Sequence, residues 1–167
     1  RVSATVMQGA SREALAQASA GVERALAASV LDAARLSDEL FAVVGMLDEQ
    51  VALRRALSDP AIDADRKAAL VESVLGSHVS AGTLDVVRDV VRSRWSRMRD
   101  LADGVEQLAV LARLVGADRD GQADEVEDEL FRFVRIVESR PTLREALANR
   151  SLPTRNKVSV VHALLDG

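Results

Sequence analysis

Apolar residues recur every three or four positions along most of this chain, which is the spacing of an amphipathic α-helix. In the first such stretch Leu15, Val22 and Leu26 share one face. The same spacing returns after each break in the pattern. It predicts an all-α fold, with helices over residues 11–28, 32–49, 51–57, 63–76, 82–97, 101–115, 124–138, 143–148 and 153–165.

Residues that end or begin helices mark the gaps between these stretches. Pro60 follows Ser58 and Asp59, and proline disfavours helical geometry in the residue before it. Asp63 can cap the free amides of the next helix, and Gly76 is of a type that commonly ends helices. Isolated helices shorter than about 12 to 15 residues are marginal in water. We therefore expect the shorter helices to be held by packing.

One stretch of the chain occurs twice. Residues 38–77 return as residues 128–167, displaced by 90 positions and without a gap. Of the 40 aligned positions, 12 are identical, and these mix charged and core-type residues: Asp38, Glu39, Leu40, Phe41, Val44, Leu53, Arg54, Ala56, Leu57, Lys67, Val71 and Leu75. Shared helical patterning alone explains the charged identities poorly. We interpret the repeat as a duplicated structural unit.

The second copy has fewer helices than the first. The first copy continues into the predicted helices 82–97 and 101–115, whereas the second reaches the equivalent point at Gly167. We therefore expect an N-terminal six-helix bundle followed by a partial second copy of the same helical unit. The expected order is a tail (1–10), the bundle (11–115), a linker (116–123) and the partial duplicate (124–167).

Composition agrees with helices and narrows the range of functions. Aromatic residues are only 2% of the 167 residues, which is a poor supply for a β-sandwich or barrel. The net charge of −4 does not favour a nucleic-acid partner. Cysteine is absent, so disulfides and thiolate metal sites are excluded. No apolar run approaches the roughly 20 residues that span a bilayer, and we expect a soluble protein in the cytoplasm without membrane insertion.

Two of the predicted helices carry unusual faces. The helix over 11–28 is rich in small side chains, which permits close approach of another helix. The helix over 82–97 has apolar residues on more than one side, including Val86 and Val90 as well as Leu84, Val87 and Val91. Either face can be explained by neighbours inside the bundle or by a binding partner.

The sequence contains almost no pattern of residues that is typical of a catalytic or metal-binding site. His78 and His162 have no histidine or cysteine neighbour at metal-ligand spacing, and we interpret both as structural or solvated. Residues 118–127 place acidic side chains partly as a calcium loop would, but Gly116 stands where the first carboxylate ligand is needed. We interpret this segment as an acidic linker, and expect no cofactor and no metal.

Four pieces of the chain, together with Lys67, resemble a known family: 7–16 (MQGASREALA), 53–60 (LRRALSDP), 94–96 (RWS) and 124–133 (DEVEDELFRF). In this order and spacing they resemble the delta subunit of F-type ATP synthase in its long actinobacterial form. That subunit is the bacterial counterpart of the oligomycin-sensitivity-conferral protein. The resemblance covers nearly the whole chain after Met7 and implies an N-terminal six-helix bundle.

The resemblance also implies a function without catalysis. The family's subunit ties the catalytic head to the peripheral stalk during proton-driven ATP synthesis, on the cytoplasmic side of the plasma membrane. Its groove between the first and fifth helices receives an amphipathic helix from the N-terminus of an alpha subunit. The contacts implied here are Ala14, Leu15, Ala18, Ser19 and Val22 on the first helix and Leu84, Val87, Val90, Val91 and Arg94 on the fifth.

A second partner follows from the same resemblance. The family's C-terminal domain meets the b subunit of the stalk, and from the resemblance we expect these 167 residues not to include that domain. The alternative to this assignment is an unrelated helical adaptor or scaffold domain that binds an amphipathic helix of another partner.

Overall fold

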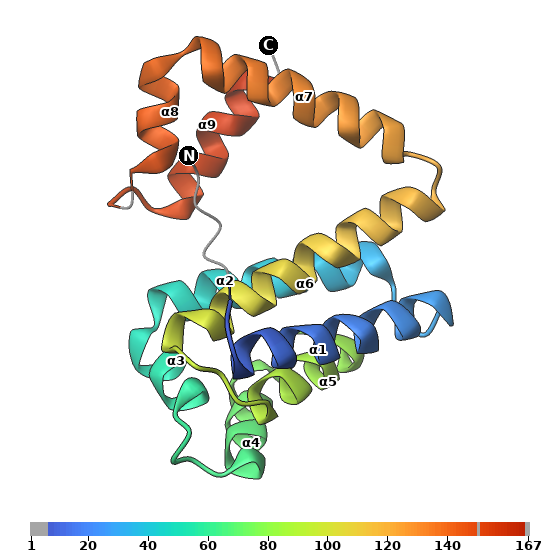
Figure 1. Cartoon of the computed structure of the whole chain (residues 1–167), viewed down its shortest axis with the longest axis vertical. Coiled ribbons are helices and arrows are strands. Elements are labelled where there is room, and N and C mark those ends of the chain that lie inside the picture. Colours follow the sequence, from blue (N-terminus) through green and yellow to red (C-terminus); the bar gives the residue numbers. More distant parts are fainter. Residues whose placement is uncertain (1–6, 150, 166–167) are drawn as a thin grey trace. The chain divides into compact units, whose positions relative to one another are not determined.

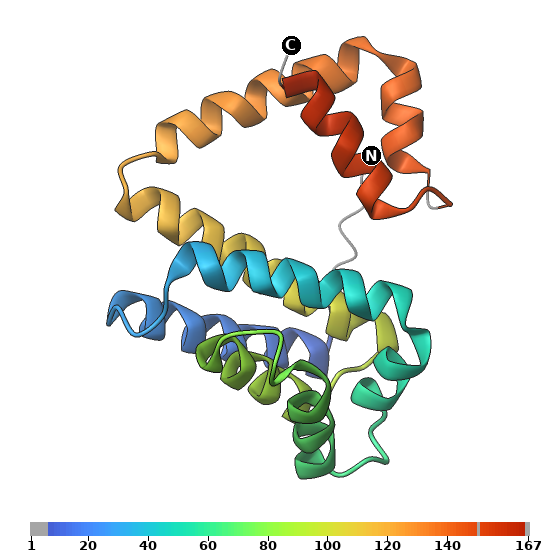
Figure 2. The same cartoon turned by 180° about the vertical axis from the view of Figure 1, so that it is seen from behind.

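The computed structural model describes residues 7–149 and 151–165, and within these residues every regular element is a helix. The all-α prediction is therefore confirmed. The helices, shown in Figures 1 and 2, are α1 (Ala10–Ala27), α2 (Ala33–Glu49), α3 (Val51–Ser58), α4 (Ala64–Leu75), α5 (Ala81–Arg92), α6 (Met98–Arg119), α7 (Ala123–Ser139), α8 (Pro141–Ala148) and α9 (Thr154–Leu165).

The chain divides into two compact units, Arg1–Arg119 and Asp120–Gly167. The first, which we call the bundle, contains α1 to α6. Its central element is α6, which packs against α1, α2, α3 and α5, while α4 packs against α5. Both views show α2 running beside α6 (Figures 1 and 2). The second, which we call the three-helix unit, contains α7 to α9.

Leucines from α2 and α6 form the centre of the bundle. Leu40 and Leu47 of α2 and Leu101 and Leu108 of α6 are all exposed by 2% or less. Ala109 and other alanines on α6 are equally buried, and their small side chains let the neighbouring helices approach closely. Full burial of each leucine contributes about 1.5–3 kcal/mol to folding. The bundle is therefore organised by apolar packing on α6.

Polar side chains fix the helix ends where the sequence indicated. Asp63 Oδ1 accepts hydrogen bonds from the first amides of α4, and α3 ends at Ser58, before Pro60. Arg54, in the segment that resembles the delta family, donates from Nη1 to the carbonyl oxygen of Leu47 at 2.9 Å. This bond satisfies a carbonyl in the last turn of α2, which has no partner within the helix. The predicted ends of α3 and α4 are confirmed.

The prediction for the fifth and sixth helices is wrong at their junction. Helix α5 ends at Arg92 instead of residue 97, and α6 begins at Met98. The reason is Trp95, which is only 4% exposed and donates from Nε1 to the carbonyl oxygen of Val90 at 2.8 Å. Its ring lies against Gly104 of α6, where a Cβ would collide with it. Burying this ring requires the chain to leave the helix.

The ends of the bundle also differ from the expected tail and linker. Helix α6 continues to Arg119, so Gly116 lies inside it instead of opening a linker. At the other end Met7 is 6% exposed and belongs to the core, and α1 begins at Ala10. Positions 1–6 of the expected tail, and positions 150, 166 and 167 of the expected duplicate, lie outside the described residues.

A buried carboxylate ties the start of α1 to the start of α6. Asp100 is 1% exposed and accepts hydrogen bonds from Ser11 Oγ at 2.7 Å and, as an ion pair, from Arg97 Nη2 at 2.9 Å. Ser11 Oγ in turn accepts from the amide of Ser96 at 2.7 Å. Because each of these buried groups is paired, the network offsets the cost of burying a charge.

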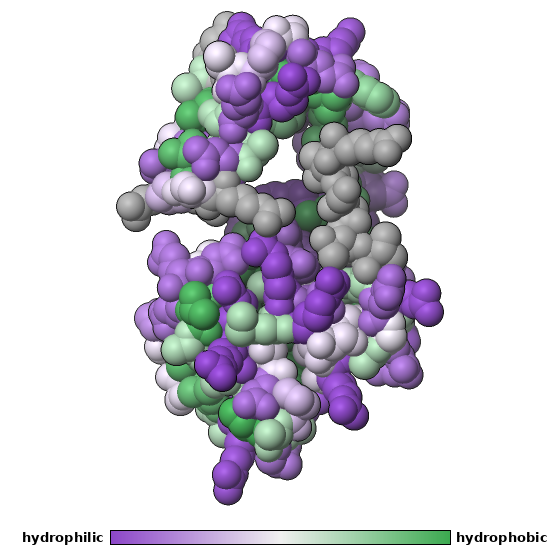
Figure 3. Space-filling model, turned by 60° about the vertical axis from the view of Figure 1, so that its left-hand side comes forward, coloured by the Kyte–Doolittle hydropathy of each residue, from purple (hydrophilic) through white to green (hydrophobic). Residues whose placement is uncertain are grey.

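The three-helix unit repeats the bounds of three bundle helices. Helices α7, α8 and α9 begin and end 90 positions after α2, α3 and α4. Burial differs, however: Leu40 of α2 is 0% exposed and the matching Leu130 of α7 is 55% exposed. Figure 3, coloured by hydropathy, shows hydrophobic residues lying among hydrophilic ones on one face of the molecule. Among the described residues of its own unit, α7 has no counterpart of α6 that would cover the side on which Leu130 lies.

This difference gives a matched pair of substitutions. Leu40→Ala should lower the free energy of unfolding of the bundle by about 2–5 kcal/mol, because it leaves a cavity beneath α6. Leu130→Ala should lower the stability of the three-helix unit by less than about 1 kcal/mol, since most of that side chain is already in water. Urea denaturation followed by circular dichroism measures both. Equal losses would contradict the difference in burial.

Candidate partner-binding groove

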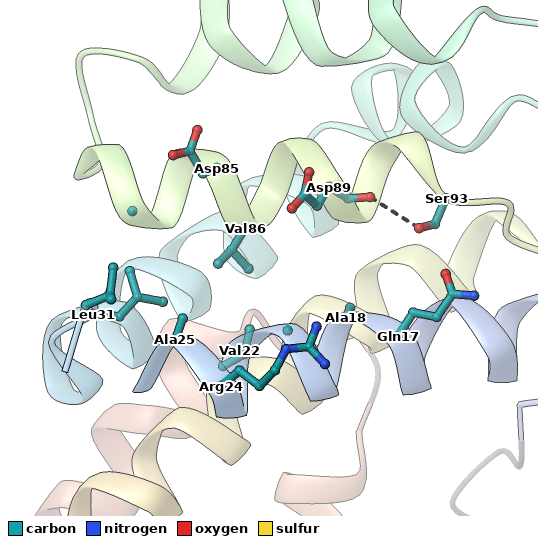
Figure 4. A pocket seen from close by; sticks show the side chains of 13 residues that line it. Gln17, Ala18, Val22, Arg24, Ala25, Leu31, Asp85, Val86, Asp89 and Ser93 are labelled. Atoms are coloured by element: carbon teal, nitrogen blue, oxygen red, sulfur yellow. Dashed lines mark hydrogen bonds between the residues drawn. The ribbon is translucent and has the colours of Figure 1, made fainter. Parts of the chain in front are cut away.

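A groove of about 540 Å³ runs between α1 and α5 on the bundle (Figure 4). Its floor and walls combine apolar and small residues with a few charged ones. The lining residues are Gln17, Ala18, Gly21, Val22, Arg24, Ala25, Val30, Leu31, Gly82, Asp85, Val86, Asp89 and Ser93.

Small residues of α1 keep the groove open. Ala18, Gly21 and Ala25 lie along one face of the helix at spacings of three and four. A Cβ placed on Gly21 would meet no atom within 4 Å. The groove therefore has free space at Gly21 that a larger side chain would fill.

Leu31 and Gly82 line one end of the groove. Leu31, in the connection from α1 to α2, lies against Gly82, and a Cβ on that glycine would collide with it. Figure 4 shows Leu31 at the α5 N-terminal end of the groove and Gln17 and Ser93 toward the other. The long axis of the groove therefore follows the two helices.

Helix α5 presents a different face to the groove than the resemblance implied. Val87, Val90 and Val91 are exposed by 2%, 1% and 1%, and they belong to the core. The wall of the groove is formed instead by Val86, with Asp85 and Asp89 beside it. The apolar residues of α5 therefore lie on two faces of the helix, and most of them pack inside the bundle.

The ten residues implied as partner contacts are only partly brought together. Ala18 and Val22 line the groove. Ala14 is buried, Leu15 and Ser19 are half-buried on α1, and Leu84 packs partly against the core. Arg94 is exposed beyond the end of α5 and lines a separate pocket. Their contact with a partner stays a prediction.

Sequence reasoning did not select most of the groove's residues. On α5, Gly82, Val86 and Asp89 follow one another at spacings of four and three, so they share one face, and Ser93 follows directly after the helix. That spacing was a usable signal, but Val86 was its only apolar member. On α1 the missed residues are Gln17, Gly21, Arg24 and Ala25, and the open space at Gly21 depends on how the helices cross.

Charges border the groove with opposite signs. Asp85 and Asp89 lie on α5, and Arg24 lies on α1. Asp85 and Asp89 are each within ion-pair distance of an arginine of their own helix, at 3.5 and 3.8 Å, but both remain exposed. Exposed pairs of this kind contribute little stability, so they can be exchanged for a partner's charges at small cost.

The position of α5 depends on a hydrogen-bonded glutamate of α2. Glu39 accepts hydrogen bonds from the amide of Ser80 at 3.0 Å, from Ser80 Oγ at 2.6 Å and from Arg35 Nε at 2.8 Å. Burial of the carboxyl opposes its ionisation, but hydrogen bonds from Ser80, Thr83 and Arg35 outweigh it and lower the pKa of Glu39 to about 2. Since Ser80 caps α5, Glu39 fixes the end of the helix that forms the groove wall.

A metal site and a membrane-spanning helix are two other features that the described part of the chain could contain. Those residues contain no group of three or more His, Asp or Glu side chains placed to hold a metal ion. Their helices include none long and apolar enough to cross a membrane.

A small all-helical bundle with an apolar groove between two helices is the architecture of modules that bind an amphipathic helix. Comparison with known proteins makes this more specific. A family model described as the ATP synthase delta (OSCP) subunit matches residues 16–114, which cover most of the bundle. The chain belongs to this family, as the motifs predicted, and the alternative of an unrelated adaptor is set aside.

Curated relatives agree with the family. The ATP synthase subunit delta of Acidothermus cellulolyticus is 52% identical over 162 residues, covering 95% of this chain and 59% of that protein. The proteins of the same name from Streptomyces avermitilis and Kineococcus radiotolerans are 48% and 41% identical over 159 residues, each covering 95% of this chain and 58% of the relative. They confirm the predicted resemblance to the delta subunit of ATP synthase. The chain spans about three fifths of the length of these relatives.

The Glu39 contact gives a pH-dependent prediction. Because the pKa of Glu39 is lower in the folded chain than its ordinary value of 4.5, its stabilisation is present above pH 4.5 and is lost as the pH falls toward 2. Glu39→Gln should therefore lower stability at pH 7 and flatten the fall in stability between pH 4.5 and pH 2. Thermal unfolding across this pH range measures it. Glu129→Gln, at the matching exposed position of α7, is the control and should keep the wild-type slope.

Proposed function

We propose that this chain acts as a structural, non-catalytic part of the ATP synthase stator, and that the groove between α1 and α5 receives the N-terminal helix of an alpha subunit. The observation that carries the proposal is the open groove itself, in a chain whose family is that of ATP synthase delta subunits. Membership in the family supports association with a membrane-associated ATP synthase complex.

The shape and chemistry of the groove suit an amphipathic helix. A helix laid along it would bury apolar side chains at positions i, i+3 or i+4, and i+7 over Ala18, Gly21 and Ala25. Each fully buried anchor would contribute on the order of 1.5–3 kcal/mol. Lysine or arginine on one side of that helix would face Asp85 and Asp89. The charges thereby specify the direction in which the helix lies.

The rest of the bundle suits a protein that transmits force. The α1 wall is anchored by the Ser11 and Asp100 contact, and the α5 wall by the Glu39 and Ser80 contact. Both walls also pack on α6. A groove whose walls are fixed in this way needs little reorganisation on binding, which preserves the free energy of the contacts. Resistance to rotor torque would then depend on the core and not on loops.

The expected connection to the b subunit remains part of this proposal. The resemblance assigns it to a C-terminal domain, and the relatives are longer than this chain. We also propose that the three-helix unit is a partial duplicate of the bundle. The identical 90-position displacement of all three helices supports this.

The groove can be tested by filling it. Gly21→Leu places a large side chain in the open space of α1 and should weaken binding of a peptide from the N-terminus of the same organism's alpha subunit by at least about tenfold. The measurement is fluorescence anisotropy of a labelled peptide. Leucine favours helix more than glycine does, so the variant should fold.

Gly45→Leu is the matched control. Gly45 lies in α2, away from the groove lining, and a Cβ there also meets no atom within 4 Å. This variant should bind the peptide as the wild type does. Failure of the wild-type chain to bind the peptide, or equal weakening in both variants, would refute the proposed site.

A further inference from the structure

A second pocket of the bundle carries positive charge that the groove does not use. It measures about 330 Å³ and lies between the loop before α4, the first turns of α4 and the segment that follows α5. Its lining includes Lys67, Arg92, Arg94, Asp63 and Trp95.

Lys67 is the unusual residue of this pocket. It is only 6% exposed, and its ammonium group has no hydrogen bond or ion pair with any described residue. Burial lowers the pKa of Lys67, and the charge of Asp59 opposes this shift only in part. The aliphatic stem of Lys67 is buried, but its unpaired ammonium group reaches the surface of the pocket. An anion entering the pocket would supply the missing partner.

The neighbouring arginines add to the positive charge. Arg94 is exposed and has no ion pair with any described side chain. Arg92 is paired with Asp65 at 3.3 Å and, more distantly, with Asp89 at 3.8 Å. Two of the three cations in the lining are therefore available for a ligand.

The acidic residue of the lining is already engaged. Asp63 Oδ1 accepts hydrogen bonds from the amides of Asp65 at 3.0 Å and Arg66 at 3.3 Å. The amides of Asp65 and Arg66 are thus occupied by Asp63 and are not free to cradle a phosphate, which is the usual way in which a helix N-terminus binds one. The donors that remain are the ammonium of Lys67 and the guanidinium of Arg94, and a guanidinium matches the two oxygens of a carboxylate.

We propose that this pocket binds a carboxylate group, held between Lys67 and Arg94. Pro60, Ile62 and Trp95 supply an apolar wall for the carbon atoms next to the carboxylate, which favours an organic anion over an inorganic one. An acidic side chain of a bound protein segment and a free small carboxylate share this chemistry. The proposal does not depend on the helix-binding role of the groove, because free anions suffice to test it.

The test is an NMR titration of the whole 167-residue chain at constant ionic strength. The probes are acetate, succinate, N-acetyl-glutamate amide and inorganic phosphate, with chloride as the reference ion. The carboxylates should shift the indole Nε1–H of Trp95 and the amides of Ala64 and Lys67 in a saturable way. Tighter binding of the capped glutamate than of acetate identifies a peptide side chain as the ligand, and the reverse order identifies a small carboxylate.

Variants separate the site from general charge effects. Lys67→Met and Arg94→Gln should each weaken carboxylate binding by at least about tenfold. Lys67→Met removes the charge and keeps an unbranched apolar stem in the buried position, so the bundle should stay folded. Lys157→Met, at the matching half-buried position of α9, should leave binding unchanged.

Three results would overturn the proposal. They are shifts no larger than those caused by chloride, phosphate binding as tight as that of the carboxylates, and carboxylate binding that survives in Lys67→Met. Arg94 would not be part of the site if a carboxylate shifts the Trp95 signal of the folded Arg94→Gln variant as much as it shifts that of the wild type.

Discussion

The burial of α6 against α2 is the interaction on which the bundle depends. Leu101 and Leu108 of α6 meet a core that contains Leu40 and Leu47, and the other side of α6 receives α1. Because α3 and α5 also pack on α6, removing this helix would expose four neighbours at once. The three-helix unit shows the same pattern of α7 to α9 without such a helix, and Leu130 is correspondingly open to water.

Packing on α6 explains why α1 and α5 stay close, but polar anchors set where each begins. Ser11 binds Asp100 at the start of α1, and Ser80 binds Glu39 at the start of α5. Between these fixed ends α1 presents the small residues Ala18, Gly21 and Ala25, so the two helices leave a groove instead of closing on each other. The groove is thus a result of rigid ends combined with small side chains.

Much of the fold could be predicted from local signals, because helical spacing and caps act over a few residues. Asp63 and Pro60 marked helix ends correctly for that reason. The end of α5 could not be predicted, since it depends on Trp95 reaching back to Val90 and fitting over Gly104. The groove was predictable only in outline. Periodicity gives the faces of α5, but whether Val86 or Val87 meets the core depends on where α4 and α6 lie.

The position of Trp95 has a spectroscopic consequence. The chain has one tryptophan and no tyrosine, so its near-ultraviolet emission arises from a single ring inside the bundle. The three-helix unit contributes to the far-ultraviolet signal of helices but is silent in tryptophan emission. The two units are therefore optically distinct, and a difference between the two signals during unfolding reports directly whether they lose structure together or one after the other.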